Sequence, residues 1–163
     1  PLLFIFIDSL FVAETNRIRS LRRPEQKMSK SDFEERSRID IMDDENTIRD
    51  HVMKALTDFN SQVTYDRNER PGVSNLVDIY SGITNQSVET IVAEAQRDQL
   101  NTGAFKKRLA QIVIEHFRPK RSEYLKLMND RSYLLSILDD GRDRACEIAD
   151  KTLNEVKQIM GFN

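Results

Sequence analysis

The chain has few of the residues from which disulfides and zinc sites are built. It contains one cysteine, Cys146, and two histidines, His51 and His116, among 163 residues. One thiol cannot form a disulfide within the chain, a composition that fits a reducing compartment. One thiol and two distant histidines also cannot supply the ligands of a zinc cluster. A disulfide framework and a zinc-bound fold are therefore excluded.

Long apolar runs are equally scarce. The only one is "PLLFIFI" at residues 1–7, which Asp8 interrupts. A helix needs about 20 apolar residues to span a bilayer, so this run is far too short, and we expect no membrane partner. It also lacks the basic start and the cleavage site of a signal peptide. Because the chain begins without methionine inside apolar sequence, we expect it to be a piece of a longer protein.

Charge is plentiful but segregated. The formal net charge is only −2, although 32% of the residues are charged. Residues 17–30 hold six bases and one acid, residues 32–58 hold nine acids and four bases, and residues 97–131 hold nine bases and four acids. Blocks of this kind can mark where a polyanion binds, although solvated helix faces produce them too.

The hydrophobic pattern changes from extended to helical along the chain. Residues 1–21 read as two extended segments, and "SRIDIMDD" at 37–44 predicts a short strand with Ile39 and Ile41 on one face. Pro71 and Gly72 predict a turn. Apolar residues then recur at helical spacing in about six segments. Five of them are residues 46–59, 74–83, 85–92, 103–118 and 145–160, and the sixth continues the fourth after a kink or restart at Pro119. In the last segment the apolar stripe from Ala145 to Met160 is expected to lie in a core. The fold class is therefore mainly α, with a few strands that look like the end of an α/β domain before a helical domain.

One loop does not fit a core. "RRPEQKMSKSDFEE" (Arg22 to Glu35) carries Lys27 and Lys30 with neighbouring serines, and Met28 is the only large apolar residue between Pro24 and Asp32. Two flexible ammonium groups with small hydroxyl donors suit a polyphosphate. The loop has no glycine and no GxxxxGK pattern, so it is not a Walker-type loop. Composition alone is also compatible with a solvated basic loop that has no ligand.

The order of the letters narrows this choice. "KMSKS" resembles the signature loop of class I aminoacyl-tRNA synthetases. "RIRSLRRPEQKMSKSD", "DDENTIRDHVMKALTD", "RPGVSNLVDIYSGITNQSVE", "GAFKKRLAQIVIEHFRPKRSEYLKL" and "KTLNEVKQIMGF" resemble the carboxyl-terminal half of tryptophanyl-tRNA synthetases, in one register from Thr15 to Phe162. The intact KMSKS spelling is similar to the bacterial and mitochondrial branch. This implies a location in the bacterial cytoplasm or the mitochondrial matrix.

The resemblance also implies roles for the loop. The family forms tryptophanyl-adenylate from tryptophan and ATP, with Mg²⁺ on the phosphates, and transfers tryptophan to tRNA(Trp). Lys27 and Lys30 match the catalytic lysines that stabilise the leaving pyrophosphate. The ATP contacts implied are Ile18, whose backbone would lie against the adenine or simply belong to a strand, together with Lys27, Met28, Ser29, Lys30 and Ser31.

The chain departs from the family pattern in three places. Arg19 stands where the family usually has methionine, and Arg23 where it usually has aspartate, which questions the turn that positions the loop. Neither His51 nor His116 fits the HIGH-type motif of the other half of the site. We therefore expect this piece alone to form no adenylate.

The resemblance divides the chain into two parts. Residues 1–45 would be the end of a Rossmann-type catalytic domain with the KMSKS loop, and residues 46–163 a helical bundle that binds the anticodon arm. The full-length enzyme would be a homodimer. The alternative is a non-catalytic helical module that binds RNA or protein. The cations that could contact tRNA phosphates are Lys106, Lys107, Arg108, Arg118, Lys120, Arg121, Lys126, Arg142 and Arg144.

Overall fold

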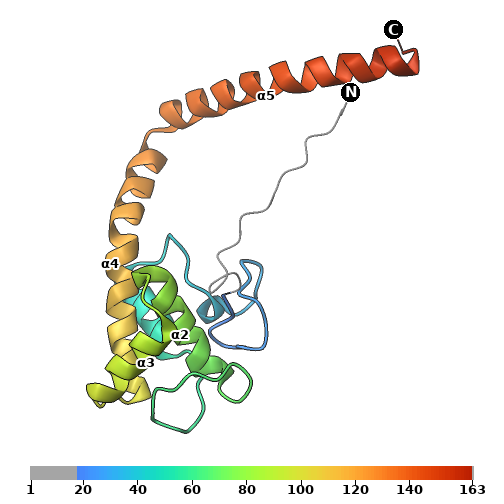
Figure 1. The fold of residues 1–163 in the computed structure, drawn as a ribbon. Coiled ribbons are helices and arrows are strands. Elements are labelled where there is room, and N and C mark those ends of the chain that lie inside the picture. The colour runs from blue at the N-terminus through green and yellow to red at the C-terminus, as the bar shows by residue number, and fades with distance from the viewer. Residues whose placement is uncertain (1–17, 163) are drawn as a thin grey trace. The chain divides into compact units, whose positions relative to one another are not determined.

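The computed structural model describes residues 18–162, so the apolar run and most of the first two predicted extended segments lie outside the described residues. Within this range the chain is mainly α-helical, as predicted. No strand forms there, and the extended pairings are two isolated antiparallel bridges, Arg19 with Lys27 and Gln62 with Asn101. Figure 1 shows the elements, which are a short 3-10 helix η1 (Glu35–Ser37) and the helices α1 (Glu45–Met53), α2 (Pro71–Thr84), α3 (Val88–Arg97), α4 (Thr102–Asn129) and α5 (Arg131–Met160).

The described residues fall into two compact units. Residues 18–121 belong to the first unit and residues 122–162 to the second, with the boundary inside α4. The division expected at residues 45 and 46 falls inside the first unit, and it stays a prediction. No helix between residues 18 and 162 combines the length and the apolar content needed to cross a bilayer.

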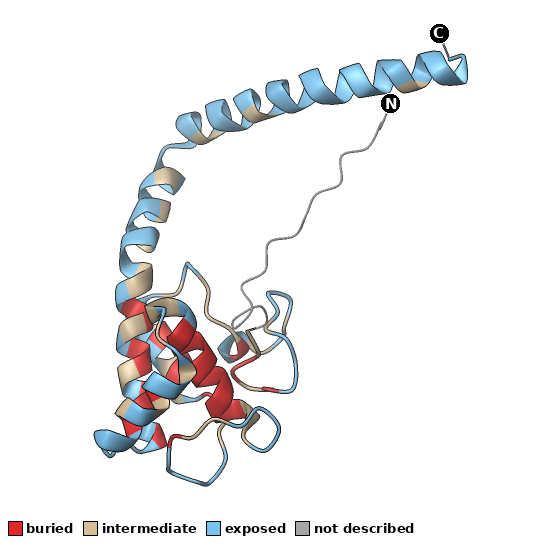
Figure 2. Ribbon diagram, viewed as in Figure 1, coloured by how far each residue is buried: buried red, intermediate tan, exposed pale blue. Residues whose placement is uncertain are grey.

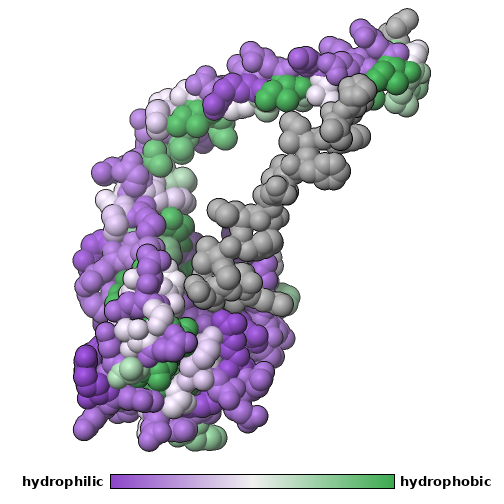
Figure 3. Space-filling model, in the orientation of Figure 1, coloured by the Kyte–Doolittle hydropathy of each residue, from purple (hydrophilic) through white to green (hydrophobic). Residues whose placement is uncertain are grey.

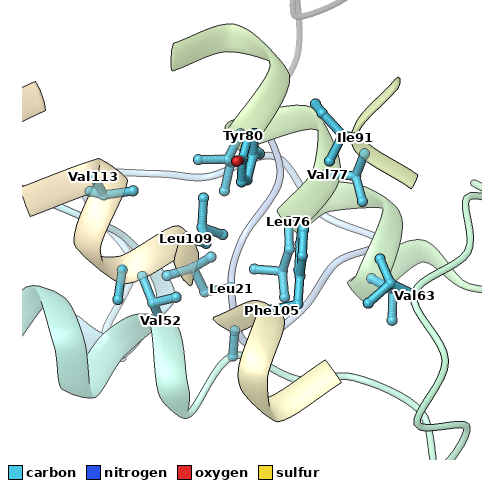
Figure 4. Packing of buried hydrophobic residues seen from close by; sticks show 14 of the residues in the cluster. Leu21, Val52, Val63, Leu76, Val77, Tyr80, Ile91, Phe105, Leu109 and Val113 are labelled. Atoms are coloured by element: carbon cyan, nitrogen blue, oxygen red, sulfur yellow. The ribbon is translucent and has the colours of Figure 1, made fainter. Parts of the chain in front are cut away.

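Apolar side chains from four helices form the core of the first unit. Figure 2 shows the buried residues concentrated where these helices meet, and Figure 4 shows their packing. Tyr80 of α2 stacks on Phe105 of α4 with ring centroids 5.7 Å apart. Each fully buried side chain of this size contributes about 1.5–3 kcal/mol. Others in the core are Leu21, Ile48, Val52, Val63, Leu76, Val77, Ile91, Leu109 and Val113.

Polar side chains set the helix ends. Asp44 precedes α1, and its carboxylate accepts a hydrogen bond from the backbone N–H of Thr47 at 2.7 Å, the usual contact of an aspartate at a helix start. Ser87 caps α3 in the same way through Thr90. Asn85 ends α2 in the left-handed conformation, with φ 56°. These three residues fix where the helices of the core begin and end.

The strand predicted at residues 37–44 is wrong. The backbone N–H of Asp40 donates to the carboxylate of Asp43 at 2.8 Å, and that of Met42 donates to the carboxylate of Asp40 at 3.2 Å. These local turns satisfy the backbone groups that a strand would offer to a neighbour. Ile39 is half-buried and Ile41 is exposed, so their alternation does not mark one buried face.

The turn predicted at Pro71 and Gly72 is also wrong, and the helix does not restart at Pro119. Pro71 and Gly72 do not form a turn but begin α2, where the missing N–H of proline costs nothing. Pro119 lies inside α4, which continues to Asn129. The helix predicted at 46–59 is shorter than expected. α1 ends at Met53, and the residues from there to Phe59 form a loop.

The second unit holds the end of α4 and all of α5. The helix predicted at 145–160 is confirmed and begins earlier, at Arg131, and Gly161 caps its end in the left-handed conformation, with φ 77°. None of the residues of α5 is buried, so the expectation that its apolar stripe lies in a core is wrong for this chain. Ile148 is 70% exposed and Ile159 is 71% exposed. Figure 3 shows apolar residues recurring along this helix.

Candidate functional site

The lysine loop leaves the core on a short pair of extended segments. Residues 18–20 run antiparallel to residues 26–28. The backbone N–H of Met28 donates to the carbonyl of Ile18 at 3.1 Å, and that of Ser20 donates to the carbonyl of Gln26 at 2.9 Å. This pairing fixes the backbone at the first two residues of the KMSKS sequence.

Salt bridges hold both ends of the loop. The guanidinium of Arg23 pairs with the carboxylate of Asp32, which also accepts a hydrogen bond from the backbone N–H of Glu34 at 3.0 Å. The Glu34 N–H and then Arg23 lower the pKa of Asp32, because both stabilise its charged form. Arg22 pairs with Glu34 at 2.7 Å and donates to the carbonyl of Lys54 at 2.6 Å. The residues between Arg23 and Asp32 are thus closed into a short loop.

The loop presents its polar side chains to solvent. Lys27, Ser29, Lys30 and Ser31 are exposed, whereas Met28 is half-buried. Within residues 18–162, neither lysine ammonium forms an ion pair or a hydrogen bond. Two unpaired cations on a closed loop can accept a polyanion without first breaking an internal salt bridge.

An apolar cavity adjoins the base of the loop. Its volume is about 290 Å³, and its walls include Ile18 and Met28 from the two paired segments. An apolar cavity beside unpaired cations suits a ligand with a flat, weakly polar part and a charged part. The remaining walls are Ile39, Ile79, Gly82, Ile83 and Phe117.

A buried asparagine ties this base to α2. The carbonyl oxygen of the Asn75 side chain accepts from the backbone N–H of Arg19 at 2.9 Å, and its amide donates to the Arg19 carbonyl at 2.9 Å. Asn75 is 2% exposed. Sequence analysis missed this residue. No signal in the sequence sets it apart, because the same helix also buries the polar residues Ser74, Asp78 and Ser81.

The two arginines that depart from the family pattern take part in the loop. Arg19 donates to the carbonyl of Pro24 at 3.1 Å, and Arg23 closes the loop through Asp32. The turn that these substitutions put in doubt is formed, with the backbone N–H of Gln26 donating to the carbonyl of Arg23 at 2.8 Å.

One cation of the predicted basic run is buried. Lys106 is 8% exposed, and its ammonium donates to the carbonyl of Ala55 at 2.7 Å and to the Thr57 hydroxyl at 3.1 Å. Its proposed contact with tRNA is therefore wrong. Burial lowers the pKa of Lys106, since the charged form loses hydration.

The other cations of this run are partly engaged. Arg108 pairs with Asp98 at 2.8 Å, and Arg118 pairs with Glu45 at 3.0 Å. Lys107 is exposed. Lys126, Arg142 and Arg144 belong to the second unit, where Lys126 and Arg142 form exposed ion pairs of low energetic value. In the described range, no group of three or more His, Cys, Asp or Glu side chains is placed to hold a metal ion.

Comparison with known families shows which family this chain belongs to. The family model described as "tRNA synthetases class I (W and Y)" matches residues 8–118, more than half of the chain. The match includes the lysine loop, the apolar cavity beside it and α2. The chain therefore belongs to the class I tRNA synthetases for tryptophan and tyrosine.

Individual relatives of this chain are named tryptophan–tRNA ligases. The chain is 44% identical over 157 residues to the tryptophan–tRNA ligase of Rickettsia conorii, covering 96% of this chain and 47% of that protein. It is 40% identical over 152 residues to the mitochondrial tryptophan–tRNA ligase of Saccharomyces cerevisiae, covering 93% and 40%. The chain thus spans about half the length of the curated relatives that it matches.

A solved structure shares the fold. The crystal structure of tryptophanyl-tRNA synthetase from Mycoplasma pneumoniae superposes with a TM-score of 0.74 at 22% identity, covering 93% of this chain and 45% of that chain. This similarity supports the fold assignment.

Proposed function

We propose that this chain is the carboxyl-terminal half of a tryptophan–tRNA ligase and contributes its ATP phosphate-binding loop. The observation that carries the proposal is the loop itself. Lys27 and Lys30 are exposed and unpaired among the described residues, on a backbone closed by Arg23 and Asp32. The relatives' shared name supplies tryptophan as the amino acid and tRNA as the acceptor, and we propose tRNA(Trp) as that acceptor.

The chemistry follows from where charge develops. The tryptophan carboxylate attacks the α-phosphorus of ATP, an anhydride P–O bond breaks, and pyrophosphate leaves with the bonding electrons. Negative charge therefore grows on the β- and γ-phosphates in the transition state. Lys30 and Lys27 are assigned to stabilise that charge. A cation lowers the activation barrier when it binds the phosphates more tightly in the transition state than in the ground state. Mg²⁺ is assigned to the phosphates of ATP.

The neighbouring residues are assigned to the rest of the nucleotide. Ile18 contributes backbone beside the adenine, at the edge of the apolar cavity that its side chain helps to line. Met28 and Ser29 contribute backbone and hydroxyl contacts to ATP, and Ser31 completes the loop. The positions of these residues at the base of the loop support the assignments. Met28 lies beside Ile18, and its backbone N–H donates to the Ile18 carbonyl at 3.1 Å.

The proposal extends to the whole protein. Residues 1–45 are assigned to the end of a Rossmann-type catalytic domain and residues 46–163 to the helical tRNA-binding part. The candidates for the phosphate contacts that hold tRNA in place are Lys107, Arg108, Arg118, Lys120 and Arg121, together with Lys126, Arg142 and Arg144. The full-length enzyme is proposed to be a homodimer in a bacterial cytoplasm or a mitochondrial matrix. The other half of the site supplies the HIGH-type motif and the tryptophan pocket, so this chain alone is expected to be inactive.

The test is tryptophan-dependent exchange of pyrophosphate with ATP by the full-length protein. We predict that Lys30→Ala lowers kcat/KM by about 10²–10³, the usual loss for one transition-state donor. Lys151→Ala on α5 is the matched control, because it removes an exposed ammonium far along the sequence from the loop. A loss below threefold for Lys30→Ala would remove the loop from the mechanism.

The same assay separates the alternatives. Replacing tryptophan with tyrosine should abolish exchange, which distinguishes the two amino acids of the family. Exchange by neither amino acid in the full-length protein would favour a non-catalytic helical module that binds RNA or protein.

A further inference from the structure

We propose that Asn75 is a positioning residue for the lysine loop, which it controls by holding the backbone of Arg19. This inference rests on the proposed function, because its consequence is the placement of Lys27 and Lys30 against the phosphates. Asn75 itself lies on α2, and its side chain bonds to the backbone of Arg19 at the base of the loop.

The geometry of the contact is specific to a primary amide. Asn75 gives one acceptor to the Arg19 N–H and one donor to the Arg19 carbonyl, both at 2.9 Å. This is the pattern that an adjoining strand would make with the same residue. A carboxylate supplies only acceptors and would face the Arg19 carbonyl without a proton. An apolar side chain would leave both backbone groups unsatisfied.

The backbone that Asn75 holds is the one that pairs with the loop. Arg19 forms the antiparallel bridge with Lys27, and Ile18 next to it accepts from the N–H of Met28. Lys27 is thus one bridge away from the Asn75 contact, and Lys30 is three residues further. Arg19 also reaches the far side of the turn, where its guanidinium donates to the Pro24 carbonyl.

The helix that carries Asn75 is a rigid support. Ten of the 14 residues of α2 are buried. Its amino-terminal turn lies against the loop after α1, where a Cβ on Gly72 would be 2.3 Å from the carbonyl oxygen of Leu56. A side chain fixed on such a platform can hold a functional loop within a fraction of an ångström. Misplacement of a catalytic group by about 1 Å can cost 10²-fold in rate.

The neighbouring residue provides a matched control. Ser74 is also buried, at 1% exposure, and its hydroxyl accepts from the backbone N–H of Asp66 at 2.9 Å. Ser74→Ala therefore removes a buried side-chain hydrogen bond of α2 that leads away from the lysine loop. A change that acts only through the stability of α2 should appear in both variants.

The experiment is steady-state pyrophosphate exchange by the full-length protein with Asn75→Asp and Ser74→Ala. We expect Asn75→Asp to lower kcat by about 10–10², with KM for tryptophan changed less than twofold. Ser74→Ala should retain kcat within about twofold at a temperature where both variants are folded. An unchanged kcat for Asn75→Asp, or equal losses for both variants, overturns the inference. If Asn75→Asp does not fold, Asn75→Ser, whose smaller hydroxyl leaves room for water, is measured with the same criteria.

A second measurement asks whether Asn75 acts through the loop lysines. In a Lys30→Ala background, the factor by which Asn75→Asp lowers kcat should be at least fivefold smaller than in the wild type, because the ammonium group that Asn75 positions is already absent. Equal losses in both backgrounds contradict a positioning role. If Lys30→Ala itself costs nothing, the proposed function fails. If Lys30→Ala is costly and Asn75→Asp is not, only the present inference fails.

Discussion

Asp32 is the residue that links the charge of the loop to its closure. Its folded-state pKa is lowered, so the folded protein favours the charged carboxylate more than the unfolded chain does. Such a group stabilises the fold above the ordinary aspartate pKa of about 3.9 and loses this contribution as the pH falls through the lower folded-state pKa.

The prediction for Asp32 is a pH-dependent loss of stability. Asp32→Asn should lower the free energy of unfolding most at pH 7, and the difference from wild type should narrow below about pH 3.9. Urea unfolding across this range measures the difference. Asp150→Asn, at an exposed position on α5, is the control for removal of a surface carboxylate. A deficit that is equal at pH 7 and pH 3 would show that the charge of Asp32 is not involved.

Lys106 and Lys107 are adjacent in sequence and differ in burial. The ammonium of Lys106 satisfies the carbonyl of Ala55, just beyond the end of α1, whereas Lys107 is exposed. Lys106→Ala should lower the free energy of unfolding by about 1–3 kcal/mol, because a buried carbonyl loses its donor. Lys107→Ala should change it by less than about 0.5 kcal/mol. Equal effects in denaturant unfolding would contradict this structural role for Lys106.

The sequence predicted the candidate lysines of the loop better than it predicted which polar side chains are buried. The letters of the KMSKS segment identified the candidate lysines, because motif spacing is read directly from the chain. The burial of Lys106 could not be read there, since a basic run on a helix gives no sign of which cation turns inward. Asn75 was missed for the same reason, as its partner Arg19 is 56 residues away.

At the scale of elements, the start of α2 depends on a close approach between backbones. Gly72 lies where a Cβ would be 2.3 Å from the carbonyl oxygen of Leu56, a backbone atom that cannot rotate away. Gly72→Ala should therefore lower the free energy of unfolding by about 1–3 kcal/mol, despite the better helix propensity of alanine.

Gly141 on α5 supplies the control for Gly72. Nothing lies within 4 Å of the position of its added Cβ. Gly141→Ala should stabilise its helix by about 0.5–1 kcal/mol. Thermal melts followed by circular dichroism measure both variants. Stabilisation by Gly72→Ala would show that α2 can move away from Leu56.

Helices were predicted better than extended segments. Apolar spacing identified the long helices α4 and α5 because three- and four-residue periodicity persists over many turns. The alternation at Ile39 and Ile41 gave a false strand, since Asp40 and Asp43 close local turns there. Pro71 was read as a turn because its sequence signal does not distinguish a turn from the first position of a helix.

At the scale of the whole molecule, burial divides the chain unequally. The first unit contains the buried apolar cluster, whereas α5 has no buried residue. The helical periodicity of apolar residues predicted an apolar stripe on α5. It could not predict whether other residues of this chain pack against that stripe. The family membership, in contrast, follows from a match across residues 8–118, and the lysine loop lies within that match.

The central claim is that Lys27 and Lys30 hold the phosphates of ATP during tryptophan activation. The most direct test is the acetylation rate of each lysine in the full-length protein, followed by mass spectrometry, with exposed Lys151 as the internal reference. Pyrophosphate, or ATP with tryptophan, should slow acetylation of Lys27 and Lys30 and leave Lys151 unchanged. Full reactivity of both loop lysines at saturating ATP and tryptophan, or protection by RNA alone, would contradict the claim.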